Sequence, residues 1–206
     1  TYADILGINY DVINRGWSGS GNEKIFYFFM QDIKNNEITD KDIVILQWSG
    51  ITRWNYLNKE NEWLGDGNIF LPHNKQIYQT IQKWYNPDYE LEKTHNYCVS
   101  AESLLKNIGC QYVFLSLNQI PKSPIKFLMS DLKTTYKGNY EFRRNEIGKR
   151  IKKGGVDDHP TVLQHYDIAS KIASHFDLDI SNTKTKVDDM HLQIIKESKF
   201  GIVYKF

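Results

Sequence analysis

The clearest apolar runs in the chain are two short ones that contain few polar positions. "DIVILQW" covers residues 42–48, and "QYVFLSL" covers residues 111–117. Strands that are buried on both faces of a parallel sheet have this near-continuous apolar pattern. The sequence therefore predicts two strands of a mainly parallel sheet at these positions. We predict a further, shorter strand at residues 11–14.

Other segments carry apolar residues at helical spacing. Residues 22–35 are predicted to form a helix. The apolar face of this helix is formed by Ile25, Phe28, Phe29 and Ile33. A longer helix is predicted to end near Ile108, because the following Gly109 is a typical stop signal. Residues 2–6 are interpreted as the end of a helix that Gly7 closes.

The order of strand, loop, helix, strand, helix and strand predicts a doubly wound α/β fold. A chain of 206 residues is long enough for one domain with a proper core. We therefore expect a single domain over residues 1–206, with three α/β/α layers and a mainly parallel, flavodoxin-like sheet. Polar or charged insertions are expected at residues 55–74 and 121–155.

Composition excludes several classes of protein. Apolar residues make up 40% of the chain and charged residues 25%, which is ordinary for a soluble globular protein. The net charge of +1 gives no general basic surface for nucleic acid. No apolar run approaches the roughly 18 residues of a membrane span. Cys98 and Cys110 are the only cysteines, which indicates reduced core thiols. Nothing in the sequence indicates a compartment or an oligomeric state.

Three loops that are far apart in the sequence are expected to meet at one edge of the sheet. They are the Gly/Ser loop at residues 15–22, "QWSGITRW" at residues 47–54 and "DDHP" at residues 157–160. Open α/β sheets bind ligands at the carboxyl ends of their strands. The convergence of these loops therefore predicts a functional site there.

Together these segments resemble the SGNH/GDSL hydrolase superfamily, most closely its viral and polysaccharide-related versions. "NRGWSG" at residues 14–19 resembles the second block of the family, in which a glycine, here Gly19, supplies a backbone N–H to the oxyanion hole. "DIVILQWSGITR" at residues 42–53 lies where the third block is expected. "DDHPT" at residues 157–161 resembles the last block, in which an acid and a histidine precede the final helix.

The resemblance implies a serine esterase that removes an acyl group, with acetyl as the first choice, from a carbohydrate or a small ester. His159 would be the general base and then the general acid, and Asp157 would orient its ring, with Asp158 as the second choice. The third block of the family offers an asparagine to the oxyanion. Here the candidates are the hydroxyls of Ser49 and Thr52. No metal or cofactor is implied, because no cluster of histidines and acids has ligand spacing.

The first block of the family, which carries the nucleophilic serine, has no match. Residues 1–7 resemble the helix that should follow it, so we expect the nucleophile upstream of Thr1. Without the first strand the sheet would have long unpaired edges, which proteins avoid. "FGIVYKF" at residues 200–206 is a strand candidate that would fill part of this gap or extend an edge. The alternatives are a non-catalytic carbohydrate-binding or structural (virion) module, and an O-acyltransferase.

Each candidate residue also has an ordinary structural interpretation. Asp158 can cap the following helix, with His159 packed beside Pro160 at an early helical position. Gly19 can be a plain turn glycine. The hydroxyls of Ser18 and Ser20 are interpreted as caps of the helix that begins at Asn22, not as nucleophiles.

Further candidates lie outside the three blocks. Asp188 and His191 have acid-x-x-histidine spacing, but we interpret them as part of the start of a surface helix. The substrate-binding candidates are Trp48, Arg53 and Trp54, because aromatic faces and a planar guanidinium suit sugars. Ordinary packing and a surface ion pair explain these three residues equally well. The basic run at residues 143–153 is interpreted as a solvated loop, with attraction of an anionic substrate as the alternative.

Overall fold

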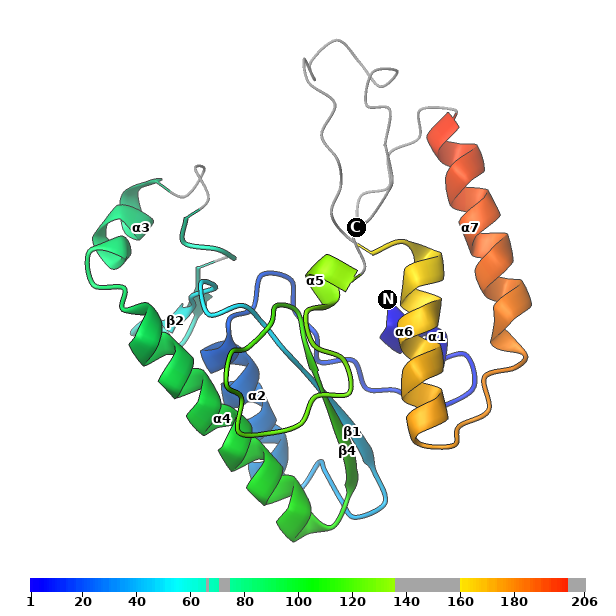
Figure 1. The fold of residues 1–206 in the computed structure, drawn as a ribbon, viewed down its shortest axis with the longest axis horizontal. Coiled ribbons are helices and arrows are strands. Elements are labelled where there is room, and N and C mark those ends of the chain that lie inside the picture. The colour runs from blue at the N-terminus through cyan, green and yellow to red at the C-terminus, as the bar shows by residue number, and fades with distance from the viewer. Residues whose placement is uncertain (66, 71–74, 136–159, 200–206) are drawn as a thin grey trace. The chain divides into compact units, whose positions relative to one another are not determined.

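The chain forms two compact units in the computed structural model (Figure 1). The structure describes residues 1–65, 67–70, 75–135 and 160–199. One unit contains residues 15–132, and in the other residues 1–14 associate with the described part of residues 133–206. The expectation of a single domain stays a prediction. No helix within the described ranges has the length and apolar character that a membrane span requires.

The unit of residues 15–132 is built around a small parallel sheet. Strand β1 (Ile43–Trp48) pairs with strand β4 (Gln111–Ser116), in register from Ile43 opposite Gln111 to Trp48 opposite Ser116. Both strands were predicted, and a small parallel sheet accompanied by several helices is compatible with the predicted α/β class. The strands β2 (Tyr56–Leu57) and β3 (Trp63–Leu64) form a separate antiparallel hairpin within the expected insertion.

The two edges of the parallel pair differ. Beyond β4, the N–H of Leu128 donates to the carbonyl of Phe114, and the N–H of Ser116 donates to the carbonyl of Met129. This segment therefore lies alongside β4 in a parallel direction. In the part of the chain that the structure describes, β1 pairs with another strand along one edge only.

Two predicted helices pack on one face of this sheet. Helix α2 (Asn22–Lys34) and helix α4 (Pro87–Ile108) enclose a core with the side chains of Trp48 and Phe114. Helix α4 ends at Gly109, whose φ of +84° lies in the left-handed region that favours glycine, as the sequence indicated. The shorter helices α3 (Lys75–Gln82) and α5 (Leu132–Thr135) complete the chain to residue 135.

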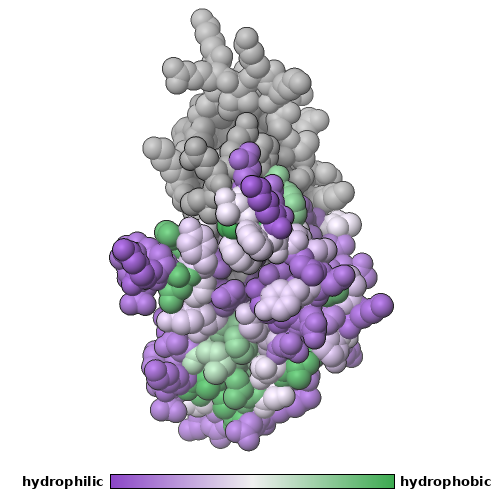
Figure 2. Space-filling model, turned by 90° about the vertical axis from the view of Figure 1, so that its left-hand side faces the viewer, coloured by the Kyte–Doolittle hydropathy of each residue, from purple (hydrophilic) through white to green (hydrophobic). Residues whose placement is uncertain are grey.

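Part of the apolar surface of α2 and α4 remains accessible. Phe26 and Met30 of α2 are only half-buried, and Val99 of α4 is exposed. Figure 2 shows apolar surface gathered in the lower part of the face on which α3 and α4 lie. The aromatic side chain of Trp63 covers another part of α2, with its ring centroid 5.2 Å from that of Tyr27.

Two expectations about strands are wrong. Residues 11–14 form no strand, and Ile13 is 70% exposed, so this short apolar pair finds no buried partner. Strand β1 was expected to be buried on both faces. Its residues are mostly half-buried, and only Trp48 is fully buried, because only the face of Val44, Leu46 and Trp48 packs against the helical core.

The second unit contains the helices α1 (Tyr2–Leu6), α6 (Val162–His175) and α7 (Thr183–Lys199). Helix α1 packs on α6, and α6 packs on α7. Their buried side chains include Leu6, Ile168, Ile172 and Val187. Helix α1 ends at Gly7 as predicted. The alternative interpretation placed Pro160 at an early position of the late helix, but α6 begins two residues later, at Val162, after Thr161 as its N-cap.

Candidate functional site

The Gly/Ser loop before α2 lies against the segment that follows β1. The carbonyl of Gly19 accepts a hydrogen bond from the N–H of Gly67 (3.1 Å), and two residues later the N–H of Ile69 donates to the carbonyl of Thr52 (3.0 Å). Residues 67–69 therefore bridge the two loops. Gly19 has a φ of +76°, a conformation that favours glycine. Its N–H makes no hydrogen bond to any described residue.

Gly21 makes the closest backbone contact between these loops. A Cβ at this position would lie 2.3 Å from the carbonyl oxygen of Arg53, so only glycine fits without a shift of the backbone. The N–H of Gly21 donates to Oδ1 of Asn55, and Nδ2 of Asn55 donates to the carbonyl of Gly65. Asn55 is buried, and its side-chain amide thus holds the Gly/Ser loop through buried hydrogen bonds.

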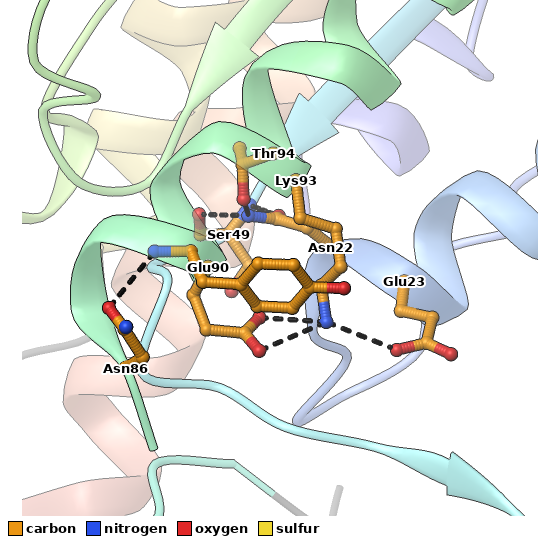
Figure 3. Close-up of polar contacts among 8 residues, drawn as sticks. Asn22, Glu23, Ser49, Asn86, Glu90, Lys93 and Thr94 are labelled. Atoms are coloured by element: carbon orange, nitrogen blue, oxygen red, sulfur yellow. Dashed lines mark hydrogen bonds and ion pairs between the residues drawn. The ribbon is translucent and has the colours of Figure 1, made fainter. Parts of the chain in front are cut away.

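Asn22 holds the carboxyl end of β1 against the start of α2 and α4 (Figure 3). Its Oδ1 accepts from the N–H of Ser49 (2.7 Å), and its Nδ2 donates to the carbonyl of Ser49 (3.1 Å) and to Oγ1 of Thr94 (3.0 Å). All three residues are buried. The side-chain amide thus satisfies both backbone groups of Ser49, as a neighbouring strand would.

A second polar group in Figure 3 contains the Lys93 ammonium. Its Nζ lies 2.8 Å from Oε2 of Glu90 and 3.5 Å from Oε2 of Glu23. Burial lowers the pKa of Lys93, but the hydrogen bond and charge of Glu90, with a contribution from Glu23, outweigh it, and the net shift is upward. This lysine is therefore held in its charged form.

The two candidate hydroxyl donors differ in accessibility. Oγ of Ser49 is buried and has no hydrogen-bond partner within the described part of the chain. Thr52 is only half-buried. Of the two residues, Thr52 is thus the one that is partly accessible to solvent. The sequence left this choice open, since both residues follow the same strand.

Sequence reasoning missed another amide at the carboxyl ends of β1 and β4. A Cβ on Gly50 would lie 2.7 Å from Oδ1 of Asn118, so the side chain of Asn118 lies directly against Gly50. Asn118 is half-buried. Asn22, Asn55 and Asn118 carry no local motif, and only the position of each residue close to the end of a helix or strand could have indicated them.

The acid–histidine pair cannot be placed from the structure, because Asp157, Asp158 and His159 lie outside the described residues. The capping interpretation of Asp158 is wrong. Thr161 is the N-cap of α6, with Oγ1 accepting from the N–H of Gln164 (3.1 Å) and the N–H of Thr161 donating to Oε1 of Gln164 (2.8 Å). The expected capping of α2 by Ser18 or Ser20 is also wrong, because its N-cap is Gly21, with no side-chain cap.

The rival pair lies inside α7 rather than at a helix start. The carboxylate of Asp188 forms an ion pair with Nζ of Lys184 (3.1 Å), one helical turn earlier. This is an ordinary i,i+4 pair on a helix surface. The structure gives Asp188 a partner other than His191, which agrees with the surface-helix interpretation.

The three substrate-binding candidates lie in different environments. Trp48 is 0% exposed and packs beside Phe114, so its side chain belongs to the core and the binding role is wrong for it. Trp54 is half-buried, and its ring centroid lies 6.1 Å from that of Tyr56. Arg53 is half-buried, and burial lowers its pKa.

Comparisons with protein-family models, with curated proteins and with solved structures give no match. In the portion covered by the described ranges, no group of three or more histidines, cysteines and acids is placed to hold a metal ion.

Proposed function

We propose that this chain is an SGNH-like serine esterase that removes an acyl group, with acetyl as the first choice, from a carbohydrate. The supporting observation is the pairing of the Gly19 loop with the loop that follows β1, through residues 67–69. The Gly19 loop carries an unpaired backbone N–H and the loop after β1 carries the half-buried Thr52, and α/β proteins bind ligands at the carboxyl ends of parallel strands. In this proposal the small parallel sheet is part of a three-layer, flavodoxin-like fold.

In the proposed reaction a serine outside residues 1–206 attacks the acyl carbonyl, and His159 accepts its proton. Asp157 orients the imidazole and stabilises its cation. The carbonyl oxygen becomes negatively charged and accepts hydrogen bonds from the N–H of Gly19 and the hydroxyl of Thr52. His159 then gives its proton to the leaving sugar oxygen, and water releases the acyl group by the same steps.

The experiment uses the natural full-length protein with an acetylated glycan and a small activated acetyl ester. His159→Ala should remove most activity, because without a base the serine hydroxyl is a weak nucleophile. His175→Ala is the matched control, since His175 is exposed at the end of α6 and should leave the rate unchanged. Equal rates for wild-type protein and His159→Ala would refute the proposal.

The oxyanion donors give a second readout in the same assay. Thr52→Ala should lower kcat by about 10²–10³, and Thr52→Ser should restore much of it. Ser49→Ala should have a smaller effect on kcat, because the Ser49 hydroxyl is buried. The opposite order would show that the wrong hydroxyl was chosen.

A non-catalytic carbohydrate-binding module is the second candidate. The half-buried aromatic pair of Trp54 and Tyr56 favours it, because a sugar can stack on such rings. Full-length protein that binds the glycan without hydrolysing it would support this alternative. Transfer of the acyl group to a sugar hydroxyl rather than to water would instead indicate an O-acyltransferase.

A further inference from the structure

Two cationic side chains beside the Gly19 loop are withdrawn from solvent without a carboxylate partner. Lys24, in the first turn of α2, is only 5% exposed, and its Nζ lies 4.7 Å from the centroid of the Trp17 ring. The half-buried Arg53 guanidinium makes no hydrogen bond or ion pair with any residue that the structure describes. A charge withdrawn from solvent is unfavourable unless a partner compensates it, and among the described residues the Trp17 ring beside Lys24 is the one partner that these two cations have.

Lys93 provides the contrast within the same unit. It is also largely buried, and it has two carboxylates, Glu90 and Glu23, within 4 Å. The usual stabilisation of a buried cation, by neighbouring carboxylates, is therefore present in this unit at Lys93. Lys24 and Arg53 lack it, although Glu23 is the residue next to Lys24 and is directed to Lys93 instead.

The neutral groups around these cations are also hydrogen-bond donors without acceptors. The backbone N–H groups of residues 22–24, at the start of α2, have no acceptor in the described part of the chain, and neither has the N–H of Gly19. The buried Ser49 hydroxyl has no partner either. A helix N-terminus with unpaired N–H groups favours a negative charge.

The backbone brings these groups together. Gly21 packs on the carbonyl of Arg53, and Lys24 follows Gly21 by less than one helical turn. Asn22, between them, binds Ser49. The backbone segments that carry Arg53, Lys24 and the unpaired N–H groups thus meet at one loop, and the described carboxylate nearest to Lys24 in sequence, Glu23, is already paired.

We propose that Arg53, Lys24 and the start of α2 bind an oxyanion, a carboxylate or a phosphate, carried by a carbohydrate. This inference deepens the proposed function and rests on it for the identity of the ligand: the substrate class becomes acidic glycans. The Arg53 guanidinium supplies a planar pair of donors, and Lys24 supplies a second charge.

Binding is measured by NMR titration of the full-length protein with four probes. These are a galacturonate trisaccharide, a neutral galactose trisaccharide, galactose 6-phosphate and inorganic phosphate. An anionic sugar should bind at least about tenfold more tightly than the neutral trisaccharide. Arg53→Gln should weaken anion binding about 10- to 100-fold, and Arg53→Lys should weaken it less, because the charge remains but the planar fork is lost.

Lys24→Gln should weaken binding of the same probes about tenfold without changing the affinity for the neutral sugar. The matched control is Lys41→Gln, an exposed lysine just before β1, which should bind the anionic probes like wild type. Urea unfolding of each variant checks the fold. If Lys24→Gln does not fold, the two Arg53 variants carry the test.

Galacturonate binding identifies a carboxylate source, and binding of the phosphates alone identifies a phosphate source; either supports the site. Equal affinity for neutral and anionic sugars, no binding at all, or an equal loss in Lys41→Gln would overturn it. Anion binding by a protein that hydrolyses no ester would refute the proposed esterase activity but support the proposed anion site. Hydrolysis without any preference for acidic substrates would refute the site alone.

Discussion

The helices α2 and α6 both begin in loops that the sequence assigned to the site, but their starts are stabilised differently. The N-cap of α2, Gly21, offers no side chain, and its N–H is bound by Asn55, 34 residues away. Asn22 then reaches Ser49 and Thr94, 27 and 72 residues away. The start of α6 needs only Thr161 and Gln164, three residues apart.

The start of α2 is thus a long-range junction, formed by Asn22, Ser49 and Thr94, whereas the start of α6 is a local cap. The start of α2 joins the end of β1 to α4, so a change there affects several segments at once. The start of α6 is a capping box, which satisfies its own backbone groups. Its cap is complete without Asp158, so the start of this helix does not depend on that acid.

The largest expected effect comes from Asn22→Ala. The substitution leaves the buried N–H and carbonyl of Ser49 without partners, and each unsatisfied group costs about 1–3 kcal/mol. We expect a loss of about 3 kcal/mol in the free energy of unfolding, measured by urea denaturation. Asn35→Ala is the matched control, because Asn35 lies at the exposed end of the same helix and should change stability by less than about 0.5 kcal/mol.

The long-range character of this junction is tested by adding Thr94→Val. If Asn22 and Thr94 act through their hydrogen bond, the double substitution should cost less than the sum of the single ones. Strictly additive losses, or an Asn22→Ala variant as stable as wild type, would show that the junction does not hold the loops together.

The elements that were predicted well depend on local patterns. The apolar run of β1 and the stop at Gly109 are readable from neighbouring residues alone. The failed strand at residues 11–14 had only a short apolar pair to support it. Trp48 was expected to contact substrate, although the alternation of Val44, Leu46 and Trp48 places it on the core face of β1.

The candidate site was predictable only in outline. The rule that strands present their carboxyl ends to ligands correctly brought the loops of Gly19 and Thr52 together. The groups that hold these loops together, Asn22, Asn55 and Thr94, were not predicted, because each has a hydrogen-bond partner 27 to 72 residues away in the chain. A polar residue whose partners are that distant has no sequence pattern to identify it.

A smaller effect is expected from Thr161→Ala, which breaks the local cap. Loss of an N-cap typically costs about 1 kcal/mol, because one backbone N–H of the first turn loses its acceptor. Thr161→Ser should retain most of this stability. Urea unfolding at neutral pH measures both variants. A loss as large as that of Asn22→Ala would mean that this helix start also has long-range contacts, and the contrast between the two starts would fail.

The smallest effect is expected for a local contact at Asp42, which contrasts with the long-range contacts of Asn22 in the same unit of residues 15–132. Oδ2 of Asp42, just before β1, accepts from Oγ1 (2.8 Å) and the N–H (2.7 Å) of Thr39. Both hydrogen bonds lower the pKa of Asp42, and the one from the hydroxyl makes the larger contribution. The pKa of the folded state is thus below the unfolded value of about 3.9. The stabilisation is therefore present above the unfolded pKa and is lost as the pH falls through the folded pKa.

Asp42→Ala should consequently cost about 0.5 kcal/mol at about pH 7, a small value because the carboxylate is exposed. The difference in unfolding free energy between variant and wild type should shrink below about pH 4 and vanish once the carboxyl is protonated in the folded state. Urea unfolding across this pH range measures this difference, with Asp40→Ala, an exposed neighbour, as the control.

The junction of Asn22, Ser49 and Thr94 contains no titratable group, so the loss of stability in Asn22→Ala should stay constant over the same pH range. A pH-dependent loss of stability for Asn22→Ala, or a pH-independent loss for Asp42→Ala, would contradict this prediction. The contact at Asp42 would then not be a local charged one, or the junction at Asn22 would not be neutral.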